Sequence, residues 1–162
     1  MQERFTTLLT QHSGIVFKVA LTYCWHKDDR AELQQEITTQ LWRAFPKYDP
    51  GQRFSTWMYR IALNVAISWL RKHSLTKRHF VPYDERDDSR ADPAGEVNDD
   101  PRLELLQRFI EQLDPLNRAV MLLYLEEHSY RDIAHIIGIT ETNVASKISR
   151  LKQRVRQFDS SQ

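Results

Sequence analysis

The sequence predicts an all-α protein made of two small helical domains joined by a flexible acidic linker, and three observations lead to this prediction. Gly and Pro are scarce, at 4 and 6 of 162 residues, while helix-favouring Leu, Arg, Gln and Glu are common. Apolar residues make up 41% of the chain and recur at helical spacing, without any strand-like alternation of useful length. The segment 84–101 has almost no large apolar side chain, so it cannot order itself by burial.

Charge is segregated along the chain in the same way. We place the first domain at 1–78, the linker at 79–101 and the second domain at 102–162. Residues 1–80 hold twelve basic and six acidic side chains, residues 81–101 hold two and eight, and residues 102–162 hold nine and eight. Two basic surfaces separated by an acidic strip suit a nucleic-acid partner better than the total charge of +1 does.

Three or four helices are expected in the first domain, and three of them are placed over about 4–23, 28–46 and 55–73. The first carries apolar side chains at helical spacing, and the second begins at Asp28 and Asp29, which suit the positive end of the helix dipole. A loop with the turn dipeptide Pro50-Gly51 follows the second helix, and Ser55 is a suitable N-cap for the third.

Four shorter helices are expected in the second domain, over about 102–113, 116–127, 130–137 and 141–157. Asp114-Pro115 is typical of a helix start, and Ser129 has the spacing of a capping box with Asp132. Gly138 ends the third of these helices, and Thr140 caps the fourth.

The segment 129–152 has the pattern of a helix-turn-helix. Ala134 is the small residue at the helix crossing, Gly138 makes the tight turn, and Val144 and Ile148 tie the second helix to Ile133 and Ile137 of the first. The second helix is then expected to enter the major groove of DNA, with basic side chains on phosphates. The expected contact residues are Glu141, Thr142, Asn143, Ser146, Lys147, Arg150 and Arg154. The alternative is an ordinary helical hairpin with a basic outer face.

Aromatic side chains are dense between residues 42 and 69, with Arg and Lys between them. This pattern suits single-stranded DNA, because unpaired bases stack on rings while the backbone follows the positive charge. The alternative is packing, which the core spacing of Phe54, Trp57 and Trp69 favours. Tyr48 and Tyr59 are expected to be the exposed rings.

Chemical catalysis finds no support in the sequence. Cys24 and His26 have no second ligand pair at zinc spacing, and neither a Gly-rich phosphate loop nor a Ser/His/Asp set occurs. We therefore expect no enzyme activity, no cofactor and no metal. A single cysteine, the absence of a secretory signal and the absence of a long apolar stretch predict a cytoplasmic protein without membrane insertion.

Two motifs together resemble one family. The order of a Gln-Gln-Glu helix, Trp-Arg-Ala-Phe, Tyr-Asp-Pro-Gly, Phe-Ser-Thr-Trp and Arg-Ile-Ala-x-Asn resembles region 2 of the extracytoplasmic-function sigma factors. Residues 129–157 resemble region 4 of the same family. The resemblance covers nearly the whole chain, and both motifs stand in the expected order. The chain differs from the family pattern at Thr38, Leu63, Ser68 and Ala145, so the base contacts of relatives cannot be assigned directly to this chain.

The resemblance implies a non-enzymatic subunit that binds core RNA polymerase and directs transcription from specific promoters. Region 2 would bind the β′ clamp helices and capture the minus-10 element, and region 4 would read the minus-35 element and bind the β flap. An anti-sigma factor is a further expected partner. The implied polymerase-binding residues are Glu32, Leu33, Gln35, Glu36 and Trp42. The implied minus-10 residues are Tyr48, Asp49, Arg53, Tyr59, Arg60, Asn64 and Arg71. A stand-alone helix-turn-helix regulator is the alternative function.

Overall fold

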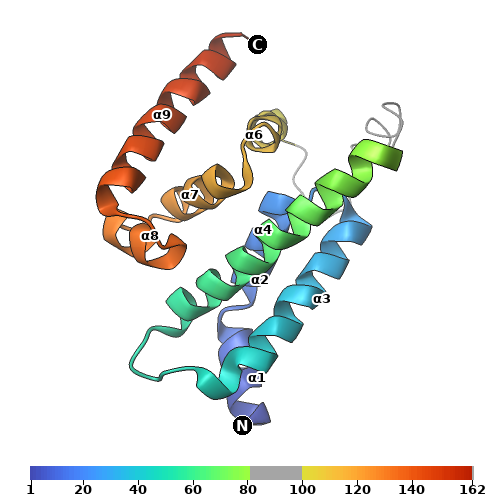
Figure 1. The fold of residues 1–162 in the computed structure, drawn as a ribbon, viewed down its shortest axis with the longest axis vertical. Helices are drawn as coiled ribbons and strands as arrows, with labels where there is room; N and C mark the ends of the chain where they lie inside the picture. Colours follow the sequence, from blue (N-terminus) through green and yellow to red (C-terminus); the bar gives the residue numbers. More distant parts are fainter. Residues whose placement is uncertain (81–99, 162) are drawn as a thin grey trace. The chain divides into compact units, whose positions relative to one another are not determined.

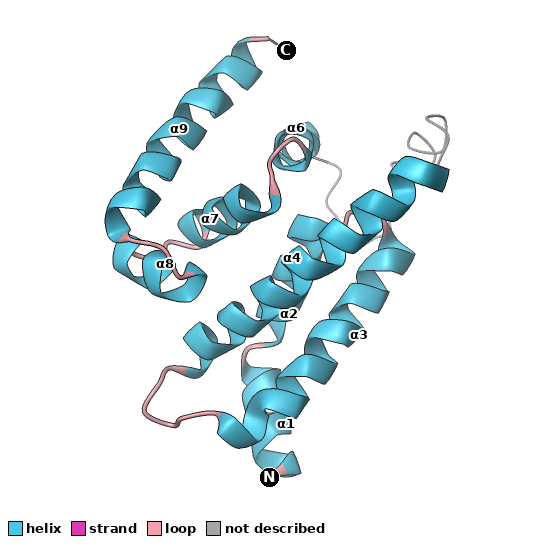
Figure 2. Cartoon of the chain, in the orientation of Figure 1, coloured by secondary structure: helices cyan, strands magenta, loops and turns pink. Residues whose placement is uncertain are grey.

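Helices account for all regular structure in the described part of the chain, which is residues 1–80 and 100–161 of a computed structural model (Figures 1 and 2). The chain divides into two units, and the second begins at Asp100. Both observations confirm the predicted all-α class with two helical domains. The predicted acidic linker, 79–101, falls almost wholly outside the described residues, and its limits remain predictions.

The first unit contains α1 (Gln2–Gln11), α2 (Ser13–Tyr23), α3 (Lys27–Ala44), the short 3-10 helix η1 (Phe45–Lys47) and α4 (Phe54–Phe80). The helices α2, α3 and α4 pack against one another. Leu33, Ile37 and Leu41 of α3 are fully buried, as their spacing predicts. Burial of each such side chain contributes about 1.5–3 kcal/mol, so this stripe fixes which face of α3 remains outside.

The first predicted helix is in fact two, and this is a correction. α1 ends at Gln11, and α2 begins at Ser13. Between them, His12 leaves the helical conformation at φ −121° and ψ 26°, and its Nδ1 lies 3.0 Å from the carbonyl oxygen of Leu8. Ser13 and Gly14 have low helix propensity, which favours a break at this point.

The long helix of this unit also differs from its prediction. α4 begins at Phe54 rather than after a cap at Ser55, because the carbonyl of Arg53 already accepts the amide of Trp57 at 3.2 Å. It runs to Phe80, beyond the predicted end at His73. The sequence 52–81 has neither Gly nor Pro, so nothing in it ends the helix early.

The second unit contains α6 (Pro101–Glu111), α7 (Pro115–Leu125), α8 (Tyr130–Ile137) and α9 (Glu141–Ser160). The helices α7, α8 and α9 pack together, and the ring of Phe109 on α6 meets that of Phe158 on α9 at 5.6 Å. The buried Arg118 of α7 donates to the carbonyls of Leu113 at 3.1 Å and Glu111 at 3.0 Å. These bonds satisfy free carbonyls at the end of α6 and fix the angle between α6 and α7.

Candidate nucleic-acid interface

The turn between α8 and α9 is built by three local devices that the sequence predicts. The Ser129 hydroxyl accepts the amide of Asp132 at 3.1 Å at the start of α8. Gly138 ends that helix in the left-handed region, at φ 85°. The Thr140 hydroxyl accepts the amide of Asn143 at 3.0 Å and starts α9. Each device satisfies backbone groups that a helix end leaves free, so the turn is defined by short-range chemistry.

Apolar contacts hold the two helices of this motif together. Ile133 and Ala134 of α8 are buried, as are Val144 and Ile148 of α9. The predicted partner Ile137 is only half-buried, and Ile136 takes the buried place instead. The motif is therefore a packed helix-turn-helix with α9 as its second helix.

The outward face of α9 carries the expected DNA contacts. Thr142, Ser146 and Arg150 recur every four residues on the side opposite Val144 and Ile148, and Asn143, Lys147 and Arg154 lie next to them. Ser146 and Lys147 are half-buried, and the other five expected residues, Glu141, Thr142, Asn143, Arg150 and Arg154, are exposed. Gln153 is exposed on the same face and is absent from the predicted set, although the spacing from Arg150 could have indicated it.

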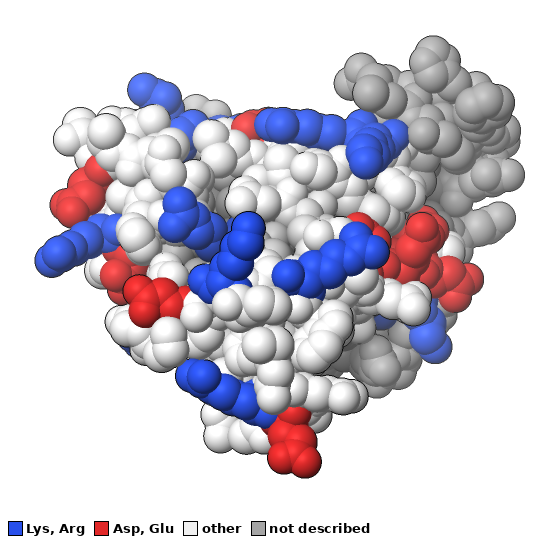
Figure 3. All heavy atoms as spheres, turned by 60° about the horizontal axis from the view of Figure 1, so that its bottom comes forward, with Lys and Arg blue, Asp and Glu red and all other residues white. Residues whose placement is uncertain are grey.

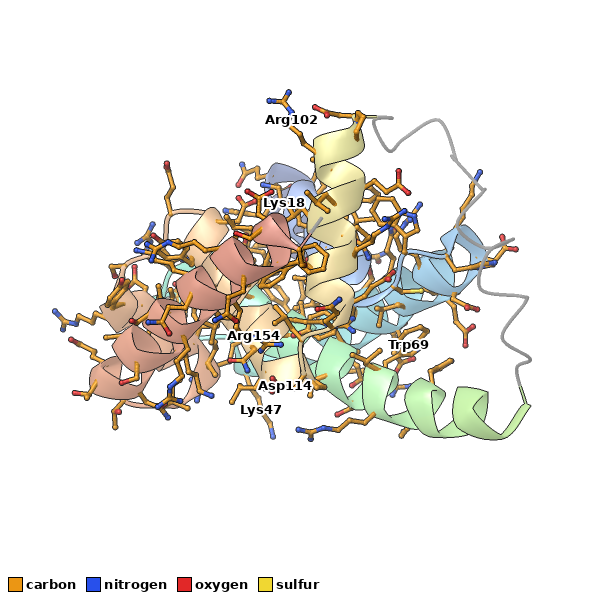
Figure 4. All side chains as sticks on the ribbon, turned by 90° about the horizontal axis from the view of Figure 1, so that it is seen from above. Lys18, Lys47, Trp69, Arg102, Asp114 and Arg154 are labelled. Atoms are coloured by element: carbon orange, nitrogen blue, oxygen red, sulfur yellow. The ribbon has the colours of Figure 1, made fainter. Side chains whose placement is uncertain are left out.

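One basic side chain of α9 is already engaged within the unit. The ammonium of Lys152 lies 5.2 Å from the ring centroid of Tyr124 on α7. A hydrogen bond that the ammonium donates to the Tyr124 side chain raises the pKa of Lys152 above its ordinary value. Lys152 therefore braces α9 against α7, while Arg154 is on the exposed part of α9 (Figure 4).

In the first unit, the loop between η1 and α4 folds back on itself. The Tyr48 hydroxyl donates to the carbonyl of Gln52 at 2.6 Å, and a carboxylate oxygen of Asp49 accepts the amide of Gly51 at 2.9 Å. A Cβ at Gly51 would come within 3.3 Å of that carboxylate, so a larger residue there would require the Asp49 side chain to shift slightly. The loop thus has a defined shape that leaves Asp49 and Arg53 exposed.

An aromatic cluster lies under this loop. Tyr48 packs against Phe45, Phe54 and Trp57, with ring centroids 5.9, 5.4 and 5.1 Å away. Phe54 and Trp57 are buried, and so is Trp69 farther along α4 (Figure 4), as their core spacing predicts. Tyr48 is half-buried, so part of its ring remains available at the surface.

The outward face of α4 brings together three of the expected minus-10 residues. Arg60, Asn64 and Arg71 are exposed and share one side of the helix. Tyr59 does not belong with them. Its side chain is only 4% exposed, so the expectation that it is an exposed contact is wrong. In a helix, neighbouring residues point about 100° apart, and the step from Arg60 to Tyr59 turns the ring into the core.

The outward face of α3 carries Glu32, Gln35, Glu36 and Trp42, all exposed. Leu33 is fully buried, so its expected contact with polymerase needs correction: it packs inside the unit and cannot reach a partner directly. The indole of Trp42 is 42% exposed, the largest apolar group on this face. An exposed Trp beside carboxylates and an amide is typical of a protein-binding surface.

Lys and Arg side chains project separately from the face drawn in Figure 3. Lys47, next to the Tyr48–Arg53 loop, is exposed and points away from the ribbons in Figure 4. It is absent from the predicted contacts, although it is a basic residue directly before the loop. Together with Arg53 and Arg60 it makes the surroundings of the loop cationic, which favours a nucleic-acid backbone.

Other kinds of site are not supported by the described residues. No group of three or more His, Cys, Asp or Glu side chains in 1–80 and 100–161 could hold a metal ion. None of the helices in those ranges combines the length and apolar character that a membrane crossing requires.

A groove on the second unit is lined by Phe109, Arg154 and Phe158, among others.

Family models match both units. Residues 8–76 match the model described as Sigma-70 region 2, and residues 103–155 match the model described as Sigma-70, region 4. The first match covers α2, α3 and most of α4, and the second contains the helix-turn-helix.

Several curated sigma factors are similar over most of the chain. The ECF RNA polymerase sigma factor SigE of Mycolicibacterium smegmatis is 30% identical over 154 residues, which cover 93% of this chain and 60% of that protein. The chain therefore spans less than two thirds of the length of that relative. The ECF RNA polymerase sigma factor SigM of Bacillus subtilis is 26% identical, with 87% of this chain and 86% of that protein covered.

Solved structures have the same fold. The sigma factor RpoE in complex with the anti-sigma factor NepR from Bartonella quintana matches with a TM-score of 0.72 at 21% identity, covering 98% of each chain. CnrH in complex with the cytosolic domain of CnrY matches with a TM-score of 0.68 at 21% identity, covering 99% of this chain and 90% of that one.

Both region models match in order on this chain, and curated sigma factors are similar over most of it; together these findings lead to one family. The protein belongs to the sigma-70 family of RNA polymerase sigma factors, in its extracytoplasmic-function group, whose members are non-enzymatic and direct RNA polymerase to promoters.

Proposed function

We propose that the chain binds core RNA polymerase through the outward face of α3 and promoter DNA through two separate surfaces. The observation that carries this proposal is the presence, in one chain, of a packed helix-turn-helix and of a cationic loop set on an aromatic cluster. The first fits duplex DNA, and the second fits an opened strand.

The polymerase surface consists of Glu32, Gln35, Glu36 and Trp42, and the clamp helices of β′ are the proposed partner. The buried Leu33 supports this surface from beneath. The groove lined by Phe109, Gln112 and Phe158 is the proposed seat of the β flap on the second unit, because its two rings offer an apolar floor.

The minus-10 surface consists of the loop with Tyr48, Asp49 and Arg53 and the α4 residues Arg60, Asn64 and Arg71. Its cations follow the phosphates of the non-template strand, while the half-buried ring of Tyr48 offers a stacking surface for an unpaired base. Binding to the opened strand shifts the equilibrium from closed to open promoter without a chemical step.

The minus-35 surface is the outward face of α9. Thr142, Asn143 and Ser146, near its N-terminus, are proposed to face base edges, and Lys147, Arg150 and Arg154 to contact phosphates.

We place the protein in the cytoplasm, where polymerase and promoter are. An anti-sigma factor that covers its polymerase surfaces is a proposed regulator.

The experiment that tests this function compares promoter binding with and without core enzyme. Genomic fragments from the protein's own bacterium are footprinted with the chain alone, with core polymerase alone and with both. Protection that spans both promoter elements and requires both proteins, with reactive thymines inside it, is the expected result, because the chain shifts the promoter toward the open state only within the holoenzyme. Specific protection by the chain alone would instead identify a stand-alone regulator.

A further inference from the structure

α1 is attached to the first unit mainly through one side chain. Phe5 is the buried residue of α1, at 6% exposure, while Leu8 and Leu9 are half-buried. The amide of Phe5 donates to the carbonyl of Met1 at 3.0 Å, so the first turn of α1 is formed around it. The position of this helix therefore depends on what the Phe5 ring contacts.

The Phe5 ring lies between two aromatic groups of the next elements. Its centroid is 5.2 Å from that of Trp42 on α3, at an interplanar angle of 59°, and 5.1 Å from that of Phe45 on η1, at 57°. Tilted rings at this spacing attract one another through their quadrupoles. Phe45 in turn contacts Tyr48 at 5.9 Å and Trp57 at 6.1 Å, the rings under the loop.

Trp42 is held on one side and open on the other. Its side chain is 42% exposed, and Phe5 is the ring that packs against it. A Trp at the centre of an interface contributes most when its orientation is already set before binding, because the partner then need not immobilise it. Without the Phe5 ring, the indole would lose its packing partner and populate other rotamers.

We propose that Phe5 is a positioning residue for polymerase binding: by packing between Trp42 and Phe45, it docks α1 and holds the Trp42 indole in the orientation that the polymerase clamp accepts. This inference rests on the proposed function, in that it takes Trp42 to be part of the polymerase surface. It assigns to α1 a role in completing that surface, although Phe5 itself does not contact the partner.

A first measurement uses the free chain and does not involve polymerase. The protein is labelled with 5-fluorotryptophan, and its four tryptophan signals are assigned by ¹⁹F NMR with single Trp→Phe variants. Phe5→Leu keeps an apolar side chain but removes the ring, so we expect the Trp42 signal to shift and those of Trp25 and Trp69 to stay. Val19→Ala, a loss of fully buried volume on α2, is the matched control and should leave the Trp42 signal in place.

The second measurement is the affinity for core polymerase, in a double-mutant cycle. Phe5→Leu should weaken binding by roughly three- to tenfold, because the partner must now order the indole. Trp42→Ala should weaken it at least as much, and Phe5→Leu should add nothing in the Trp42→Ala background. Val19→Ala should change the affinity by less than about twofold, as its site has no partner contact.

The outcomes separate this inference from the function on which it rests. An unmoved Trp42 signal in Phe5→Leu overturns the positioning role whatever polymerase does. A weakening by Phe5→Leu that persists in full in the Trp42→Ala background also overturns it. If Trp42→Ala leaves core affinity intact while the Trp42 signal still responds to Phe5→Leu, then the proposed polymerase surface is wrong, and the inference fails with it.

Discussion

At the scale of single residues, one backbone position is strained at a helix end. Glu127 lies two residues after the end of α7 in the left-handed region, at φ 64°. The next amide, of His128, donates to the carbonyl of Leu123 at 3.0 Å, which is the bond pattern of a helix end that usually has glycine at this position. A side chain in this conformation costs about 1–2 kcal/mol.

We therefore expect Glu127→Gly to stabilise the second unit by a net value of about 1 kcal/mol. This is the strain that is removed minus the entropy that glycine adds to the unfolded chain. Glu126→Gly, one residue earlier at φ −85°, is the matched control and should destabilise it. All four tryptophans lie before residue 70, so their fluorescence reports the first unit. Amide hydrogen exchange in α7–α9 is the appropriate measurement. Faster exchange in Glu127→Gly would contradict the strain argument.

The cations of α9 give a second prediction at this scale. Replacing both Lys147 and Arg150 with Ala should weaken holoenzyme binding to the minus-35 element by roughly tenfold and lower the slope of log affinity against log salt by about two. Arg108→Ala on α6, whose guanidinium pairs with Glu104 at 3.1 Å, removes charge away from this face and should change neither quantity. Equal salt slopes in the double variant and the parent protein would remove these residues from the interface.

For single residues, the sequence predicts which motif a residue belongs to better than it predicts whether its side chain is exposed. The family resemblance implies Leu33 as a polymerase contact, although its helical spacing with Ile37 and Leu41 predicts burial, and Tyr59 is expected to be exposed; both are buried. The reason is geometric: a one-residue step on a helix turns a side chain by about 100°, and the width of the buried stripe is set by neighbouring helices that a single sequence does not place. The burial of Trp57 and Trp69 is predicted correctly, because each repeats at core spacing within α4.

At the scale of elements, the helix starts differ in how they are secured. The Asp100 carboxylate begins α6 by accepting the amide of Arg102 at 2.9 Å, and it pairs with the Arg102 guanidinium at 3.0 Å. The side-chain bond to Arg102, followed by the backbone bond, holds the pKa of Asp100 below its usual value. A lowered folded-state pKa stabilises the folded form above the unfolded pKa, and this stabilisation is lost as pH falls through the folded one.

The α6 start should therefore loosen as pH falls from the ordinary Asp pKa of about 4 toward the lower pKa of folded Asp100. The protection factors of the amides in the first turn of α6, which are corrected for the intrinsic pH dependence of exchange, should fall there. Asp100→Asn keeps an N-cap residue but cannot ionise, so its exchange should lose this pH dependence. The same acid response in the variant would show that another group is responsible.

The outward face of α3 gives the second prediction for an element. Gln35→Ala combined with Glu36→Ala should weaken binding to core polymerase by about tenfold while leaving the minus-10 contacts intact once the complex is saturated. A pull-down titration with core enzyme measures the affinity, and permanganate reactivity of the opened promoter measures the DNA contacts. Glu3→Gln on α1, an exposed acidic residue outside this face, is the control. Normal core affinity in the double variant would refute the assignment.

Element boundaries follow from the sequence where short-range chemistry decides them. The ends of α8 and the start of α9 are predicted to the residue, since Ser129, Gly138 and Thr140 act on amides within their own turn. The break at His12 and the extension of α4 past His73 are not predicted. Neither depends on a strong local stop or start: the first follows from weak propensities at Ser13 and Gly14, and the second from the lack of any helix-ending residue.

At the scale of the whole molecule, the chain has two helical units, each with its own core and its own proposed DNA-binding face. The order of the two motifs is enough to predict this division. Two weak DNA contacts on one chain strengthen each other when both are held at the spacing of their DNA elements, because the second contact is then intramolecular. If polymerase sets that spacing, the chain alone should bind promoter DNA weakly.

Runoff transcription with purified core polymerase and genomic fragments tests whether promoter recognition requires both proteins. Core enzyme from the protein's own bacterium, supplemented with this chain and freed of any inhibitor, should start RNA synthesis at a discrete set of sites that neither protein uses alone. Failure to initiate at any site in the native genome, with a core enzyme that is active with another sigma factor, would contradict the proposed function.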